Sequence, residues 1–212
     1  MRRRLSVLLA VLIGSLAATP AADAGAVLPY GSRPYGHPYA SWTEMVGQWY
    51  LGDASNPLIA GLGGECGELM HGAFFMAAPI DLGVELSCEV PAGTPIVVSH
   101  AGWFTTEGID GDTDQELADA AVAGFVTSLN ELTLDGVPLP LRPIDSGVFD
   151  VISEPGSFYD TIVGVGTGAI RTALRANVVV LHPLPPGDHE LEGAVAFVGD
   201  GAFSVTYHIH VG

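Results

Sequence analysis

The C-terminal third of the chain constrains the fold most, because it has the pattern of successive β-strands separated by turns. Residues 203–211 alternate apolar and polar side chains, and this period of two is typical of a half-buried strand. The β-branched apolar run 178–181 ends at the proline-rich turn 183–187, since proline cannot donate to a strand ladder. Asp200-Gly201 is a second turn signal. We therefore expect an all-β fold, a single antiparallel sandwich-like domain with two attached helices.

The first residues have the pattern of a signal peptide. Three arginines at 2–4 precede an apolar stretch at 5–18, which is too short for a stable membrane span. Residues 22–24 fit the small-x-small cleavage rule, so we expect a secreted, extracellular protein without membrane insertion. The predicted organisation is a signal peptide at 1–24, an irregular N-terminal arm at 25–40 and a single β-rich domain at 41–212.

The chain is strongly acidic, with 24 acidic and 7 basic residues and a formal net charge of −17. Cleavage after Ala24 removes three arginines and Asp23, which leaves 4 basic and 23 acidic residues. Such a charge repels nucleic acid and anionic membranes, so we expect no nucleic-acid partner. The charged partner expected instead is a cation or an extracellular polymer. The alternative is that the acidity serves only solubility or reflects a salty habitat.

Two segments have helical periodicity. Residues 41–44 match a capping box, and apolar residues at 42, 45, 46 and 49 form one helical face that ends near Gly52. The two tryptophans on this face predict either a core stripe or a stacking platform for sugars. A second capping box, formed by Thr113 and Glu116, precedes apolar residues that recur every four positions. The predicted stripe of this second helix is Leu117, Ala121, Phe125 and Leu129, widened by Val122 and Val126.

The two cysteines predict a disulfide. In an exported chain Cys66 and Cys88 most simply pair with each other, and closing this loop is worth about 3 kcal/mol in the chain-entropy model. Short strands at 72–78 and 84–86 flank a turn, so we expect the disulfide to join the arms of a hairpin. Phe74 and Phe75 should then lie on opposite faces.

The acidic loop before the second helix is a candidate calcium site, because alternating carboxylates can converge oxygen ligands on Ca²⁺. The candidate ligands are Asp110, Asp112, Asp114 and Glu116. The loop departs from an EF-hand, which needs glycine at position six and glutamate at position twelve, where this chain has Gln115 and Ala121. The alternative is a helix N-terminus, where carboxylates complement the macrodipole. No other cofactor is expected.

His208 and His210 lie two apart on a predicted strand, which places both rings on one face about 6.8 Å apart. They predict either a transition-metal site or a solvated outer face. The possible third ligands are His100, His182 and His189. The glycine-rich segment 164–169 lacks the strand and helix context of a dinucleotide-binding turn, so we interpret it as a loop.

The order of motifs resembles an uncharacterised family of exported bacterial and archaeal proteins, a domain of unknown function. The residues that carry the resemblance are Trp42, Trp49, 56–58, Cys66, Phe74-Phe75, 88–93, the acidic loop, 134–136, 182–189 and 205–207. The chain departs from the family at Phe74-Phe75 and at 96–98, where relatives have a Trp-Phe pair and a Phe-Phe-Pro run. The resemblance implies an exported β-rich domain and implies no activity.

No nucleophile elbow, zinc-protease motif or phosphate-binding loop is present in the sequence. We therefore expect a non-catalytic surface, matrix or ligand-binding module rather than an enzyme. The alternatives are a secreted hydrolase that uses two carboxylates and a calcium-binding exported protein.

Overall fold

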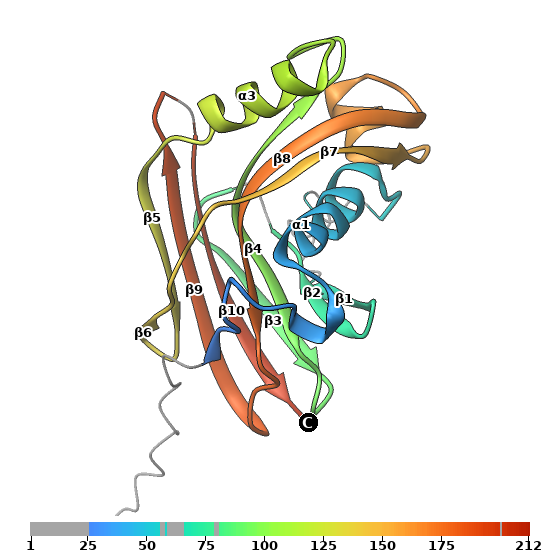
Figure 1. Cartoon of the computed structure of the whole chain (residues 1–212). Coiled ribbons are helices and arrows are strands. Elements are labelled where there is room, and N and C mark those ends of the chain that lie inside the picture. Colours follow the sequence, from blue (N-terminus) through green and yellow to red (C-terminus); the bar gives the residue numbers. More distant parts are fainter. Residues whose placement is uncertain (1–25, 56–57, 59–65, 79–80, 200) are drawn as a thin grey trace, which may run out of the picture.

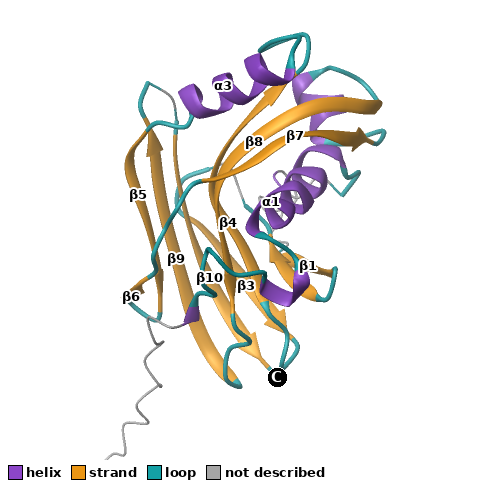
Figure 2. Cartoon of the chain, in the orientation of Figure 1, coloured by secondary structure: helices purple, strands orange, loops and turns teal. Residues whose placement is uncertain are grey.

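Strands dominate the described part of the chain and form two five-stranded sheets that pack on each other (Figures 1 and 2). The computed structural model describes residues 26–55, 58, 66–78, 81–199 and 201–212, so the predicted signal peptide lies outside it. Sheet A has the strand order β1 (Gly67–Met70), β2 (Ala73–Met76), β4 (Ile96–Thr106), β8 (Gly168–Leu181), β7 (Ile144–Ser153). Sheet B has the order β3 (Val84–Val90), β10 (Ala202–Val211), β9 (Gly187–Phe197), β5 (Thr127–Leu134), β6 (Val137–Pro138).

Most neighbouring strands are antiparallel, and the exceptions are β3 with β10 and β2 with β4. The predicted C-terminal strand is confirmed as β10, where Tyr207 and Ile209 are buried and His208 is exposed. It lies inside sheet B, between β9 and β3. β3 therefore joins the sheet only through a strand far along the chain, since the bonded pair Gly83 and Ser204 are 121 positions apart.

Sheet A is covered on both faces. Within β8, Val179 and Leu181 belong to the core between the sheets, whereas Val178 and Val180 belong to a second core on the opposite face. That second core is covered by α1 (Tyr39–Gly47), which lies on the side of sheet A turned away from sheet B (Figure 1). The helical segments that complete the described chain are η2 (Pro34–Gly36), η3 (Gln48–Gly52), α3 (Asp114–Gly124) and η5 (Tyr159–Val163).

The aromatic stripe of α1 is core. Trp42 is 0% exposed and Trp49 is 4% exposed, so neither ring has a free face for a sugar, and the predicted stacking platform is wrong. The predicted start of the helix is also wrong. The helix begins at Tyr39, directly after Pro38, and its N-cap has no side-chain hydrogen bond. Tyr39 is anchored there because its hydroxyl donates to the carbonyl of Leu28, so the helix starts before the expected capping box.

The residues before α1 run beside the end of β8. The amide of Leu28 donates to the carbonyl of Val180 at 2.9 Å, and the amide of His182 donates to the carbonyl of Ala26 at 2.9 Å. The part of the predicted N-terminal arm that is described is therefore held against sheet A by backbone hydrogen bonds.

The predicted disulfide between Cys66 and Cys88 is present, with the two Cα atoms 5.3 Å apart. The predicted hairpin is wrong: Cys66 immediately precedes β1 of sheet A and Cys88 lies in β3 of sheet B, so the bond links the two sheets. The hairpin in this region is β1–β2. Phe74 faces the core between the sheets and Phe75 faces the α1 core, as predicted. β2 pairs with β1 on one edge and with β4 on the other, so β3 pairs with β10 in sheet B instead.

The second helix is confirmed with its capping box, in which the Thr113 hydroxyl accepts from the amide of Glu116. Its buried stripe is shorter than predicted. Leu117, Ala121 and the C-cap residue Phe125 are buried as predicted, whereas Val122, Val126 and Leu129 are exposed. The helix ends at Gly124, where a β-carbon would overlap the indole of Trp103, so glycine is needed at this position.

Trp42→Ala should lower the free energy of unfolding by about 3–5 kcal/mol, because it removes a fully buried aromatic side chain from the α1 core. Urea denaturation measures the change. The matched control is Leu82→Ala, which truncates a side chain that is 63% exposed and should change stability by less than about 0.5 kcal/mol. Equal stability of the two variants would contradict the assignment of Trp42 to the core.

Candidate functional site

The candidate site lies along one edge of β4, where sheet A loses a strand. β2 pairs with β4 only through Phe74 with Ile96 and Phe75 with Val97. Beyond Val97 no described strand pairs with this edge, although β4 continues to Thr106. On its other edge β4 stays paired with β8 as far as Thr106. We call the unpaired stretch the β4 edge.

A β-bulge lies within this edge. The register between β4 and β8 shifts between Ser99 and Ala101, which adds His100 as an extra residue. A bulge changes which face the following side chains occupy. Ala101 and Trp103 therefore pack with sheet B, and the rings of Trp103 and Phe197 lie 5.7 Å apart.

The residues that alternate with these face the α1 layer. A β-carbon on Gly102 would lie 3.3 Å from the β-carbon of Ala176, and Phe104 meets the ring of Phe158 at 6.0 Å. The β4 edge therefore contacts two different layers. Sheet B lies on one side of it, and α1 and η3 lie on the other.

Between these layers the β4 edge borders a pocket of about 370 Å³. We call it the β4-edge pocket. Pockets of this size are common for small-molecule ligands. Its lining comes from several elements. Near α1 lie Gly47, Tyr50, Leu51 and Leu58; Ala78 follows β2; and 99–104 belong to β4. The remaining lining residues are Phe158, Leu174 of β8, Val195 and Phe197 of β9, and Phe203 of β10. The surface is mostly apolar and rich in aromatic rings, and no acidic residue is among the described lining residues.

Few polar side-chain groups face the pocket. Tyr50 donates its hydroxyl hydrogen to the carbonyl of Met76 at 2.6 Å, so this hydroxyl is already used. Ser99 is nearly buried at the bulge. His100 lies beside it, and its Nε2 is 3.2 Å from the carbonyl oxygen of Ala194 in β9. The imidazole therefore bridges β4 to sheet B at the wall of the pocket.

The imidazole of His100 is neutral at pH 7. Burial lowers its pKa to about 4 and outweighs the hydrogen bond to Ala194, which acts in the opposite direction. A neutral imidazole has one N–H donor and one acceptor nitrogen. The β4-edge pocket is thus an apolar space without a formal charge from His100.

The structure does not group the four predicted calcium ligands around one point. Asp114 forms an ion pair with Arg171, and the Oδ2 of Asp110 accepts from the amide of Thr106. Glu116 accepts from the amides of Asp112 and Thr113, and these hydrogen bonds lower its pKa. In the described part of the chain no three His, Cys, Asp or Glu side chains lie close enough to hold a metal ion. Calcium binding stays a prediction, and the geometry favours the helix N-terminus.

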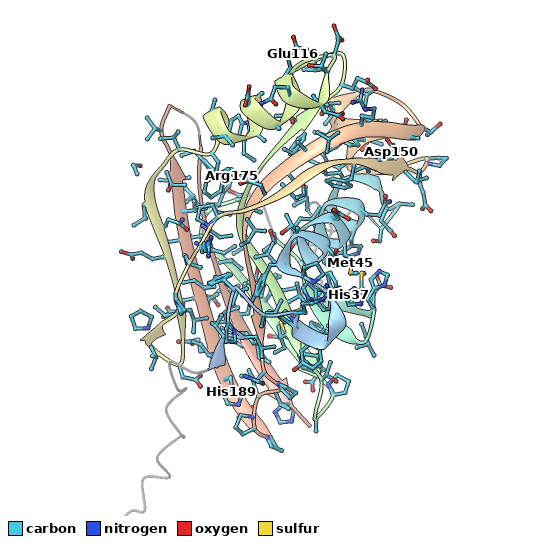
Figure 3. The ribbon with its side chains drawn as sticks, viewed as in Figure 1. His37, Met45, Glu116, Asp150, Arg175 and His189 are labelled. Atoms are coloured by element: carbon cyan, nitrogen blue, oxygen red, sulfur yellow. A yellow bond between two sulfur atoms is a disulfide. The ribbon has the colours of Figure 1, made fainter. Side chains whose placement is uncertain are left out.

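His208 and His210 share the outer face of sheet B, as predicted, but each lies beside carboxylates of neighbouring strands. The Nδ1 of His210 is 2.7 Å from Asp188, and the Nδ1 of His208 is 3.6 Å from Glu190. The proposed third ligands do not join them. His100 lies between the sheets. His189, labelled in Figure 3, pairs with Ile209, but its side chain lies on the buried face of sheet B, whereas His208 and His210 lie on the exposed face.

His189 clamps a turn. Its Nδ1 lies 2.8 Å from a carboxylate oxygen of Asp135 in the β5–β6 turn, and its Nε2 lies 2.9 Å from the carbonyl of Pro185. Both neighbours are acceptors, so the doubly protonated ring satisfies them best. Burial lowers the pKa of His189, but the hydrogen bonds to Asp135 and Pro185 outweigh it, and the net pKa is raised.

A shallow second hollow of about 330 Å³ lies on the outer face of sheet B. Glu85, Glu131 and Glu192 are among its lining residues, and the lining comes from strands of this one sheet. This hollow thus has more than one carboxylate in its lining, as a hydrolase that uses two carboxylates requires. All three side chains are exposed to water or nearly so, without an opposing wall among the described residues that line the hollow.

Comparisons with known proteins add no functional assignment. No family model matches the chain, and no curated protein matches it. One solved structure, "Solution Structure of Amebosin", aligns with 60% of this chain and 89% of that chain, at 9% sequence identity and a TM-score of 0.19. That TM-score is too low for the similarity to bear on fold or function. None of the described helices has the length and apolar character needed to span a membrane.

The stabilising effect of His189 should be largest at acidic pH. Because its folded-state pKa is raised above the ordinary value of 6.5, the contribution is fully present below 6.5 and is lost as pH rises through the folded pKa. Urea denaturation of wild type and His189→Gln from about pH 5.5 to 8.5 measures this. The difference in unfolding free energy should shrink with rising pH. A difference that stays constant, or grows, would contradict the clamp.

Calcium should raise the melting temperature no more than magnesium at equal ionic strength, because the carboxylates of Asp110, Asp114 and Glu116 already have partners in the protein. A true site would add about 2.7 kcal/mol at a calcium concentration 100 times its Kd. Thermal melting in chelator, calcium and magnesium makes the comparison. A calcium-specific rise that disappears in Asp112→Asn would establish the calcium site instead.

Proposed function

We propose that this protein is an exported, non-catalytic binding module that holds a small apolar ligand in the β4-edge pocket. One observation carries the proposal: a pocket of about 370 Å³ with an apolar, aromatic lining lies between sheet B and the α1 layer. Transfer of apolar surface from water into such a pocket contributes about 25 cal/mol per Å². Shape and burial of the ligand, rather than charge, then supply the affinity.

The same lining argues against hydrolysis in this pocket. Acid–base hydrolysis of a glycoside needs two carboxylates that flank the bond, and no acidic residue lines the described pocket wall. Among the residues that the structure describes, His100 has no carboxylate partner and bonds to a backbone carbonyl instead. A His of a catalytic triad is oriented by an acid and contacts a nucleophile, so this arrangement supports binding over catalysis.

Export belongs to the proposal as well. The disulfide between Cys66 and Cys88 fits an oxidising compartment, where such bonds persist. The signal-peptide pattern at 1–24 and the resemblance to an exported family agree with secretion. An extracellular module with an apolar pocket would bind a molecule that is poorly soluble in water.

The test uses N-phenyl-1-naphthylamine, a neutral probe that fluoresces in apolar surroundings. It should bind wild type saturably with one site per chain. Ala78→Trp places a large side chain at the pocket wall and should weaken binding at least about 10-fold, since the space is filled. Leu69→Trp adds the same side chain at a position that is 56% exposed and outside the pocket lining, so it should bind as wild type does. Absence of saturable binding to wild type, or unchanged binding to Ala78→Trp, would refute the pocket as the ligand site.

A further inference from the structure

A small side cavity lies next to the β4-edge pocket at His100. It has a volume of about 20 Å³ and shares five lining residues with the larger pocket, so the two have a common wall. The shared residues are Ala78, Ser99, His100, Val195 and Phe203. A space of about 20 Å³ is enough for one water molecule or one hydroxyl group. The side cavity therefore suits a single small polar group at one end of an apolar molecule.

The hydrogen bonding of His100 fixes which atom faces such a group. A carbonyl oxygen can only accept, so the Nε2 of His100 carries the proton and donates to Ala194. In the neutral ring Nδ1 is then an acceptor. Among the described residues Nδ1 has no hydrogen-bond partner. Nδ1 is not one of the fully buried unpaired polar atoms, so it is open to water, and a ligand with a donor group can take the place of that water.

Besides Ser99, two other polar side chains line the side cavity, and both already form hydrogen bonds. The hydroxyl of Tyr207 donates to the carbonyl of Ala77 at 2.5 Å, and the hydroxyl oxygen of Ser204 accepts from the amide of Gly83 at 2.8 Å. Gly193 leaves room for the imidazole, because a β-carbon there would lie 2.7 Å from Nδ1. The Nδ1 of His100 is thus an acceptor at the wall of the side cavity, beside Ser99.

We propose that the ligand is a neutral apolar molecule with one hydroxyl group, which donates its hydrogen bond to the Nδ1 of His100; this inference rests on the proposed function. A carboxylate in the same place would meet a lone pair instead of a proton. The formal net charge of −17 also disfavours an anionic ligand. The hydroxyl group orients the ligand, and the aromatic lining binds the rest of it.

The experiment compares three probes that share one ring system: naphthalene, 2-naphthol and 2-naphthoate at pH 7, by calorimetry. Wild type should bind 2-naphthol about 3- to 10-fold more tightly than naphthalene, as expected for one net hydrogen bond. It should bind 2-naphthoate more weakly than naphthalene. In His100→Leu the preference for 2-naphthol should vanish while naphthalene still binds, and a melting transition checks that the variant folds.

Two further variants separate positioning from folding. Gly193→Ala keeps the imidazole but displaces it, so it should also lose the preference for the hydroxyl group. Val122→Ala truncates an exposed side chain outside both linings and should keep the preference. Equal binding of naphthalene and 2-naphthol to wild type, or a preference that survives in His100→Leu, would overturn the inference and leave the binding module intact. If none of the three probes binds, the proposed function fails as well.

Discussion

The structure depends on burying one short stretch of β8 on both of its faces. Residues 178–181 are entirely inaccessible to water, and their side chains alternate between the core shared with sheet B and the core under α1. A strand of this kind needs a cover on each side, since about 25 cal/mol is lost for every Å² of apolar surface left in water. The layer of α1 and η3 is therefore part of the core that holds sheet A together.

The pocket follows from the same layered arrangement. Sheet B and the α1 layer both extend past the point where β2 stops pairing with β4. Two layers that are held apart by a sheet leave a space where the sheet lacks a strand. The bulge at His100 then distributes side chains to both sides of that space. The position of the pocket is thus set by backbone pairing, and its chemistry by the side chains of β4, β9 and β10.

Local patterns in the sequence predicted local structure well. The alternation of apolar and polar residues predicted β10, the capping box at Thr113 predicted the start of α3, and the two cysteines predicted the disulfide. Pairing between distant strands was not predictable, because cysteine spacing limits distance and does not say which sheet each cysteine joins. The pocket was missed for a related reason. The bulge places Trp103 on the face of β4 opposite to the one that strict alternation predicts. Only the pairing of β4 with β8 reveals this shift.

The place of β10 between β9 and β3 also affects how the molecule acquires its topology. β3 cannot join sheet B until a strand about 120 positions later is available, and contacts this distant in sequence fold slowly because a long loop must close first. Oxidation of Cys66 and Cys88 needs no such wait, since they are 22 positions apart. Once formed, the bond keeps β3 near the forming sheet A and shortens the time that β3 needs to meet β10. The disulfide is therefore a folding tether as well as a native crosslink.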